Sequence, residues 1–268
     1  MIINSLPELI SVLWKDYTAL NPSVLSVYDL FAKKGETVIN DHVAFRTLDY
    51  SEMNLNVLAK TFVRFGYEAK QEYHFAEKKL YAKHFEHIDP SYPKIFISEL
   101  LTEKMPFSVQ AILEKMRAQV AKDFLKRDDL ATAGRPWQVS IEDYQLLKEH
   151  SEYAAWLSAY GFRVNHFTVL VNALKTFANI SEVNQALKLA GHQLNTSGGE
   201  IKGTAKEFLE QSSTIAYNAK VIFANGELTI PACYYEFAFR YPLANGKLYS
   251  GFVAKSADKI FESTDRGQ

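Results

Sequence analysis

The spacing of hydrophobic residues divides the chain into a helical beginning and two later stretches that resemble β-structure. In residues 5–34, apolar side chains recur at helical spacing, with Leu9 and Leu13 on one stripe. The segment NPS at 21–23 begins a second helix, because Asn or Ser caps a helix and Pro fits its first turn. Gly35 follows that helix and ends it. The pattern therefore predicts two N-terminal helices.

Residues 36–102 carry a mixed pattern that we interpret as a β-α-β-β-β module. The stretch TVINDHVAFRTL, residues 37–48, is rich in β-branched and aromatic residues and predicts a strand. Apolar residues at helical spacing follow in 51–65, and Gly66 ends this predicted helix. Three short strands are expected after it, over residues 67–75, 79–88 and 94–100.

Residues 161–242 repeat the same order of elements. The stretch FRVNHFTVLVN, from residue 162, predicts a strand, and residues 173–190 predict a helix that ends at Gly191. Three strands are then expected near residues 192–195, 213–223 and 232–241. We interpret this stretch as a second β-α-β-β-β module.

The two modules can be aligned on their histidines. Gly66 follows His42 by 24 residues, and Gly191 follows His166 by 25. Glu99 lies late in the first module, where the second has Glu236. Between the modules, residues 103–160 are charged and rich in Leu and Ala, which predicts a helical insertion. We therefore predict one α+β domain over 1–268, with two βαβββ modules in a barrel-like sheet.

Composition narrows the classes of partner. The chain has 268 residues, and its 30 basic and 31 acidic residues give a net charge of -1. This balance gives no electrostatic reason to expect nucleic acid or an anionic membrane as partner. The single cysteine excludes an internal disulfide and fits a reducing compartment. There is no signal-peptide pattern and no apolar run of the ~20 residues that a membrane helix needs, so we expect a cytoplasmic protein.

Three residues on different predicted strands form a candidate metal site. In regular strands, Asn40, Ala44 and Arg46 share the face of His42, while His166 and Glu236 also have small or apolar neighbours. A polar side chain on such a face needs a partner, and a shared cation supplies one. Two imidazoles and one carboxylate form the facial triad of non-haem Fe(II) oxygenases. The same set also suits Zn²⁺, Mn²⁺ or Ni²⁺, so ligand type alone does not select iron.

Each of these residues also has a simpler interpretation. A histidine in a strand is more often a hydrogen-bonded core or surface residue than a ligand. Arg46 could clamp a substrate carboxylate, or form a structural ion pair with Glu99 or Glu236. Glu99 could be a fourth ligand, an acceptor for an imidazole N–H behind the metal, or an ion-pair partner, and we favour the acceptor role.

A rival cluster lies in the first module. His84, His87 and Asp89 are close in sequence, with His74 nearby. In a strand, however, His84 and His87 face opposite sides, which argues against joint ligation. Gln211 begins a polar stretch that could line a pocket or simply start a strand.

Several segments resemble the DUF1338 family, which includes bacterial 2-oxoadipate dioxygenase/decarboxylase. The segments are DHVAFRT (41–47), NHFTVL (165–170), SGGEIKGTAKEFLEQSSTIA (197–216), YYEFAFR (234–240) and GFVAKSADKIFEST (251–264). The resemblance implies a fold related to the vicinal oxygen chelate superfamily. It also implies metal ligation by His42, His166 and Glu236, with Arg46 in substrate binding.

The resemblance implies a reaction as well. A 2-oxo acid would react with O₂ at Fe(II) and lose CO₂. For 2-oxoadipate the product would be 2-hydroxyglutarate, a step in lysine catabolism. Two alternatives remain open: a metal-dependent lyase, isomerase or hydrolase on the same fold, and a binding module without catalysis. The dioxygenase alone predicts O₂-dependent release of CO₂, and the binding module predicts ligand retention without turnover.

Overall fold

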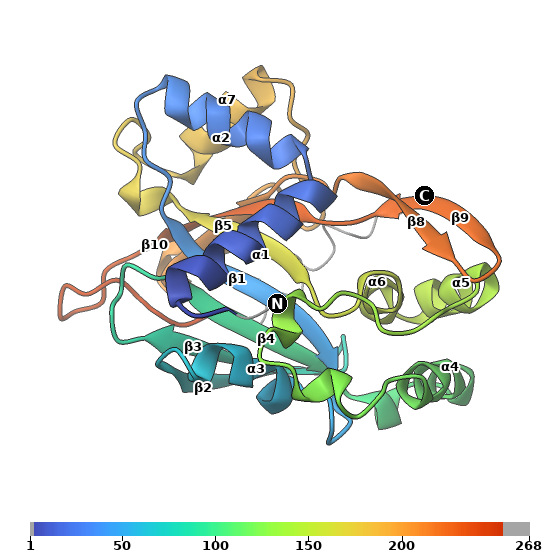
Figure 1. Ribbon diagram of the computed structural model, residues 1–268. Helices are drawn as coiled ribbons and strands as arrows, with labels where there is room; N and C mark the ends of the chain where they lie inside the picture. The colour runs from blue at the N-terminus through green and yellow to red at the C-terminus, as the bar shows by residue number, and fades with distance from the viewer. Residues whose placement is uncertain (1–2, 254–268) are drawn as a thin grey trace.

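The structure is a computed structural model that describes residues 3–253. An eight-stranded sheet forms its centre, in the order β2-β3-β4-β1-β5-β10-β7-β6, and a separate hairpin pairs β8 with β9 (Figure 1). The strands are β1 (Asn40–Leu48), β2 (Tyr67–Phe75), β3 (Leu80–His87), β4 (Lys94–Leu100), β5 (Val164–Leu170), β6 (Lys202–Thr204), β7 (Leu209–Ser213), β8 (Asn218–Phe223), β9 (Gly226–Pro231) and β10 (Tyr234–Arg240).

The sheet consists of two halves built in the same way. In the first half, β1 is followed by α3 (Leu55–Val63), β2, β3 and β4, and β1 pairs in parallel with β4. In the second, β5 is followed by α7 (Ile180–Leu189), β6, β7 and β10, and β5 pairs in parallel with β10. The antiparallel pair β1–β5 joins the halves. The predicted α+β class with two βαβββ modules is confirmed.

The second half differs from its prediction in two places. The single strand expected over 213–223 is divided, because the chain leaves the sheet after Ser213 and β8 pairs only with β9. The strand expected at 192–195 is reduced to one isolated bridge, Leu194 to Thr214, and β6 forms further along the chain. The hairpin β8–β9 packs against α5 instead of joining the sheet, with Phe223 against Tyr144.

Helices cover the outer face of the sheet with aromatic contacts. Tyr17 of α1 (Leu6–Leu20) packs against Phe167 of β5, and Phe62 of α3 packs against Phe45 of β1. Phe31 of α2 (Ser23–Lys33) packs against Phe237 of β10. The two N-terminal helices are thus as predicted, and their apolar stripes bury the face that points away from the candidate ligands.

The predicted helical insertion follows the first half of the sheet in the sequence and precedes the second. Its elements are η1 (Thr102–Lys104), α4 (Phe107–Ala118), η2 (Phe124–Lys126), η3 (Leu130–Thr132), α5 (Ile141–His150) and α6 (Glu152–Tyr160). Helix α6 is tied to the sheet by buried hydrogen bonds. The Tyr153 hydroxyl accepts from the Thr47 N–H at 3.0 Å and donates to the Ser98 carbonyl at 2.7 Å, and the Trp156 indole N–H donates to the Ala232 carbonyl. Helix α6 therefore closes one end of the inner face.

The described part of the chain has no helix with the length and hydrophobicity needed to cross a membrane. Of the segments that carry the family resemblance, residues 254–264 lie outside the described residues.

Candidate metal centre

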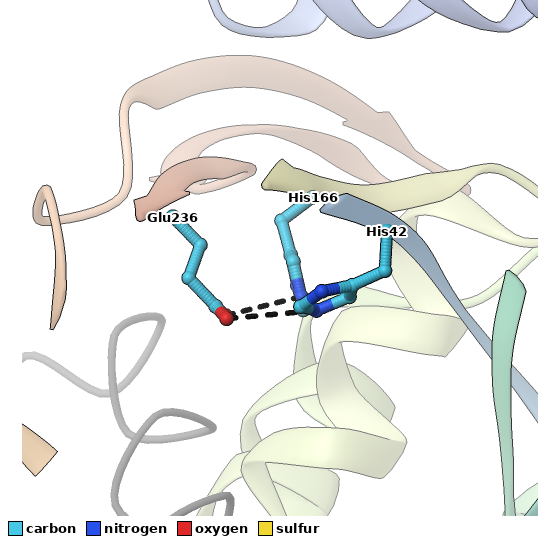
Figure 2. Close-up of side chains that lie close together, drawn as sticks. All are labelled: His42, His166 and Glu236. Carbon is cyan, nitrogen blue, oxygen red and sulfur yellow. Dashed lines mark ion pairs between the residues drawn. The ribbon is translucent and has the colours of Figure 1, made fainter. Parts of the chain in front are cut away.

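Three adjacent strands bring the predicted ligands together. His42 lies on β1, His166 on β5 and Glu236 on β10, all buried, with one ligand atom of each within 4.8 Å of the others. The Glu236 carboxylate oxygens lie 3.5 Å from Nε2 of His42 and 3.2 Å from Nε2 of His166, and Figure 2 shows both imidazoles directed at this carboxylate. The structure thus places the three side chains around a common point.

A β-bulge precedes each histidine and sets its orientation. On β1 the extra residue is Asp41, and on β5 it is Asn165, because the ladder between these strands omits both. The Nδ1–H of His42 donates to Asp41 at 2.8 Å, and that of His166 donates to Asn165 at 2.9 Å. With Nδ1 engaged as a donor, each imidazole presents the lone pair of Nε2 to the site.

The bulge at Asp41 also corrects one expectation. Asn40 pairs with Val169, whereas His42 pairs with the next residue, Thr168, so Asn40 lies on the face opposite His42. The regular alternation assumed for this strand is interrupted between them.

The chemistry of the three donors fits a divalent cation. Gln211 donates to one oxygen of Glu236 at 2.6 Å, while the other oxygen, Oε2, has no hydrogen-bond donor within the described residues. Burial raises the pKa of Glu236 to about 8 without a cation, and burial lowers the pKa of both imidazoles. Neutral imidazoles are the form that binds metals, and an orphaned buried carboxylate oxygen is satisfied by a cation.

A buried ion pair lies behind His42. Arg240 donates to both oxygens of Asp41, at 2.5 and 2.7 Å, and both side chains are 2% exposed. Burial alone would raise the pKa of Asp41, but the Arg240 guanidinium outweighs burial and holds that pKa well below its usual range. Arg240 also donates to the carbonyls of Tyr249 and Gly251. The Phe252 ring meets the His42 ring edge-on at 4.8 Å, so this segment covers the imidazole.

Arg46 is on the face of His42, as expected, but its ion pair is with a residue of the insertion. Its Nη1 donates to both oxygens of Glu152, at 2.9 and 3.1 Å. The guanidinium carbon lies 4.9 Å from the centre of the Tyr153 ring and 5.1 Å from that of Trp156. The ion pair of Arg46 is therefore with Glu152, where Glu99 or Glu236 was expected, and the guanidinium is buried beside the candidate ligands.

Comparison with known proteins assigns the family. A family model described as 2-oxoadipate dioxygenase/decarboxylase matches residues 28–248. The chain belongs to this family. The resemblance expected from the sequence is confirmed.

Relatives of the chain in the 2-oxoadipate dioxygenase/decarboxylase family include named enzymes. A protein of Oryza sativa subsp. japonica, named 2-oxoadipate dioxygenase/decarboxylase, chloroplastic/amyloplastic, is 33% identical over 97% of this chain and 78% of that protein. The crystal structure of hydroxyglutarate synthase from Oryza sativa in complex with 2-oxoadipate is similar at 33% identity and a TM-score of 0.90, over 96% of this chain and 91% of that one.

Two further solved structures are similar to this chain. A putative hydrolase from Shewanella frigidimarina is similar at 48% identity and a TM-score of 0.90, over 95% of this chain and all of that one. A putative glyoxalase superfamily protein from Ralstonia eutropha is 18% identical with a TM-score of 0.77, over 91% of this chain and 84% of that one. The second likeness supports the predicted vicinal-oxygen-chelate-like fold and no more.

The expected role of Glu99 is wrong for this family member. Glu99 pairs with Thr47, whose side chain is on the opposite face from Arg46, and its carboxylate accepts the N–H of Leu55 at 2.8 Å, at the start of α3. The alignment of the two Glu residues is also wrong. His42 pairs with Lys94 as His166 pairs with Tyr234, so the counterpart of Glu236 is Phe96, two residues beyond Lys94.

The rival histidine cluster does not form a ligand set. His84 is buried and bonded to the Tyr73 hydroxyl at 2.7 Å and to Glu86 at 3.3 Å. His87 instead accepts the N–H of Asp89 in an exposed turn. Within residues 3–253, the one group of three or more His, Cys, Asp and Glu side chains close enough to hold an ion together is His42, His166 and Glu236.

The sequence reasoning missed the acceptors behind the imidazoles. Asp41 and Asn165 each directly precede a candidate ligand, so a side chain with an acceptor oxygen comes before histidine at the same place in both modules. This repeated dipeptide is a signal that the alignment of the modules could have revealed. For Gln211, the sequence left open whether it lines a pocket or starts a strand; it lies on β7, and its side chain donates to Glu236.

Proposed function

We propose that this protein is an Fe(II)-dependent dioxygenase/decarboxylase that converts 2-oxoadipate and O₂ into 2-hydroxyglutarate and CO₂. The atoms of this reaction balance without a further co-substrate. One observation carries the proposal: in a member of the 2-oxoadipate dioxygenase/decarboxylase family, two neutral imidazoles and one carboxylate converge within 4.8 Å. The choice of 2-oxoadipate as substrate comes from the names of the relatives given above.

His42, His166 and Glu236 would hold the metal through the two Nε2 atoms and the carboxylate. Fe(II), when bound, supplies the electrons for reducing O₂ and a template for the 2-oxo acid. Three protein ligands leave further positions open for these two molecules. Asp41, Asn165 and Gln211 would keep the ligands in place through the hydrogen bonds described above.

Arg46 would bind a carboxylate of the substrate. Its guanidinium is already neutralised by Glu152, so a substrate carboxylate must share or displace that partner. Because the site is buried, an interaction with this cation is stronger than at the surface. Helix α6 on one side and Phe252 on the other would exclude water from the space around the metal and Arg46.

A second candidate is a metal-dependent hydrolase, lyase or isomerase. The relative from Shewanella frigidimarina, which is described as a putative hydrolase, favours it. Two histidines and one glutamate are also a common ligand set of catalytic Zn²⁺. This candidate consumes no O₂, which separates it from the dioxygenase.

The deciding experiment reconstitutes the metal-free protein with Fe(II) under anaerobic conditions and then adds 2-oxoadipate and O₂. We expect O₂ uptake equal to CO₂ release, with 2-hydroxyglutarate as product. His42→Ala should abolish the reaction, whereas His84→Ala, a matched buried histidine outside the triad, should retain it. Turnover of 2-oxoadipate without O₂ uptake would overturn the proposal in favour of the second candidate. Cytoplasmic location and a place in lysine catabolism stay predictions.

A further inference from the structure

The inner face of the sheet carries a buried hydroxyl that its surroundings do not satisfy. Tyr234 lies two residues before Glu236 on β10 and is 0% exposed. Its phenol oxygen has no hydrogen-bond partner among the residues that the structure describes. A hydroxyl buried without a partner destabilises the fold, and on the face of the sheet that carries the candidate metal ligands a bound molecule can supply that partner.

The position of Tyr234 points to the substrate side of the metal centre. Ala44, His166 and Tyr234 form one row across β1, β5 and β10, and the Tyr234 ring stacks on the His166 ring with centroids 4.5 Å apart. Arg46 follows Ala44 by two residues on the same face of β1, so both Tyr234 and Arg46 lie on one side of the His42 and Glu236 row.

Tyr234 and Arg46 are both buried near His166 on the inner face of the sheet. Tyr234 stacks on the His166 ring, and Arg46 lies two residues beyond Ala44, the residue of β1 that pairs with His166. On β1 the residue of this row is Ala44, whose side chain is only a methyl group and leaves room beside His166. A phenol and a guanidinium on the same face of the sheet form a pair of donors for one anionic group.

The backbone of Tyr234 is held, so the hydroxyl has little freedom to find another partner. The Tyr17 hydroxyl donates to the Tyr234 carbonyl at 2.5 Å from the outer side of the sheet. Trp156 holds the Ala232 carbonyl at 2.5 Å from α6. The ring is further fixed by its stacking on His166.

We propose that Tyr234 is a substrate-binding residue whose hydroxyl donates a hydrogen bond to the carboxylate that Arg46 holds. The inference rests on the proposed function and adds a second recognition group to it. A phenol is protonated at physiological pH, so its hydroxyl is available as a donor. The ligand class is the carboxylate of a 2-oxo acid.

The next residue provides a matched control. Tyr235 is also 0% exposed, and its hydroxyl also lacks a hydrogen-bond partner within the described residues. It points to the other face of the sheet, where its ring lies 6.3 Å from that of Tyr17. Tyr235→Phe therefore repeats the chemical change of Tyr234→Phe without reaching the site.

The test is calorimetric titration of 2-oxoadipate into the Mn²⁺-loaded protein under argon, where no turnover occurs. We expect Tyr234→Phe to weaken binding about tenfold to a hundredfold, the effect of one hydrogen bond to a charged group. Tyr235→Phe should bind like wild type. Both variants should keep wild-type Mn²⁺ affinity, because the new phenylalanine at 234 can still stack on His166 and Tyr235 lies on the other face of the sheet. Neither variant should melt at a lower temperature than wild type, because each removes a buried hydroxyl that has no partner within the described residues.

The outcomes separate this inference from the function on which it rests. If wild type binds 2-oxoadipate and Tyr234→Phe binds it equally well, the role of Tyr234 is refuted while the proposed function stands. If Tyr234→Phe loses Mn²⁺ affinity in parallel, the hydroxyl supports the metal site and the inference is again refuted. If wild type does not bind 2-oxoadipate, the proposed substrate itself is wrong.

Discussion

Replacement of Asp41 by Asn is the most severe test of the hydrogen-bond network behind the candidate metal ligands. Asp41 accepts from His42 and from two atoms of Arg240, and the carboxylate and guanidinium are both 2% exposed. Asn keeps the shape but leaves the Arg240 charge buried without its counter-ion. Breaking a buried pair in this way costs about 3–5 kcal/mol. That is a large fraction of the roughly 5–15 kcal/mol by which a domain is stable.

Asn165, the counterpart of Asp41 in the second half of the sheet, provides a comparison for this expected loss of stability. Asn165 makes the same bond to His166 but carries no charge, so Asn165→Ala should cost only about 1 kcal/mol. Asn165→Ala removes the acceptor that orients His166 and should lower Mn²⁺ affinity about tenfold to a hundredfold. Asp41→Asn keeps an amide oxygen that can accept from His42, so its effect on Mn²⁺ affinity should be smaller. Urea denaturation of the metal-free proteins at pH 7 and calorimetric Mn²⁺ titration measure the two effects separately.

The dependence on pH and a double variant complete the test. Because the pKa of Asp41 is held below its usual value in the fold, the pair stabilises the protein above about pH 4 and this contribution is lost as pH falls further. Asp41→Asn should therefore flatten the acid side of the stability curve. Arg240→Met added to Asp41→Asn should recover part of the loss. A loss of stability in Asp41→Asn no larger than that in Asn165→Ala would refute this reasoning.

Three other predictions concern Glu236, Arg46 and Glu99. The raised pKa of Glu236, about 8, means that the metal-free fold binds a proton that the unfolded chain has released. The stability of wild type relative to Glu236→Gln should therefore fall by about 1–2 kcal/mol from pH 6.5 to 8, since both proteins share the titration of their histidines. Urea denaturation of the two metal-free proteins at both pH values measures this difference, and an unchanged difference would refute it. Arg46→Lys should weaken 2-oxoadipate binding about tenfold or more and leave Mn²⁺ affinity unchanged, because Lys lacks the planar guanidinium that makes two parallel hydrogen bonds to a carboxylate. Equal 2-oxoadipate affinity of the variant and wild type in calorimetry would exclude Arg46 as the residue that binds the substrate carboxylate. Glu99→Gln should cost about 1 kcal/mol in urea denaturation through the weaker contact at the start of α3, and a drop in Mn²⁺ affinity would contradict its location.

Much of the site could be predicted from the sequence because it repeats. The strand that carries His42 and the strand that carries His166 begin equivalent modules, and they pair with each other at the centre of the sheet. Glu236 lies on the strand next to that of His166, so three strands with clear β-patterns were sufficient to bring the candidate ligands together. The helices at the N-terminus and in the insertion were equally clear from their apolar spacing.

The remainder depends on register and on contacts between distant residues. The bulges at Asp41 and Asn165 insert one residue without changing the hydrophobic pattern, so regular alternation placed Asn40 on the wrong face. Glu99 was aligned with Glu236 by its late position, although the ladder makes Phe96 the counterpart. Glu152, the partner of Arg46, is 106 residues away in the insertion, where no local pattern links the two.

The most direct test of the metal centre is anomalous diffraction at the iron edge from crystals grown with Fe(II) under anaerobic conditions. The account predicts one peak per chain between Nε2 of His42, Nε2 of His166 and the carboxylate of Glu236, about 2.0–2.2 Å from each ligand atom. A peak at another position, such as beside His84 and Glu86, would contradict the account. The absence of a peak, when dissolved crystals contain one iron per chain, would contradict it as well.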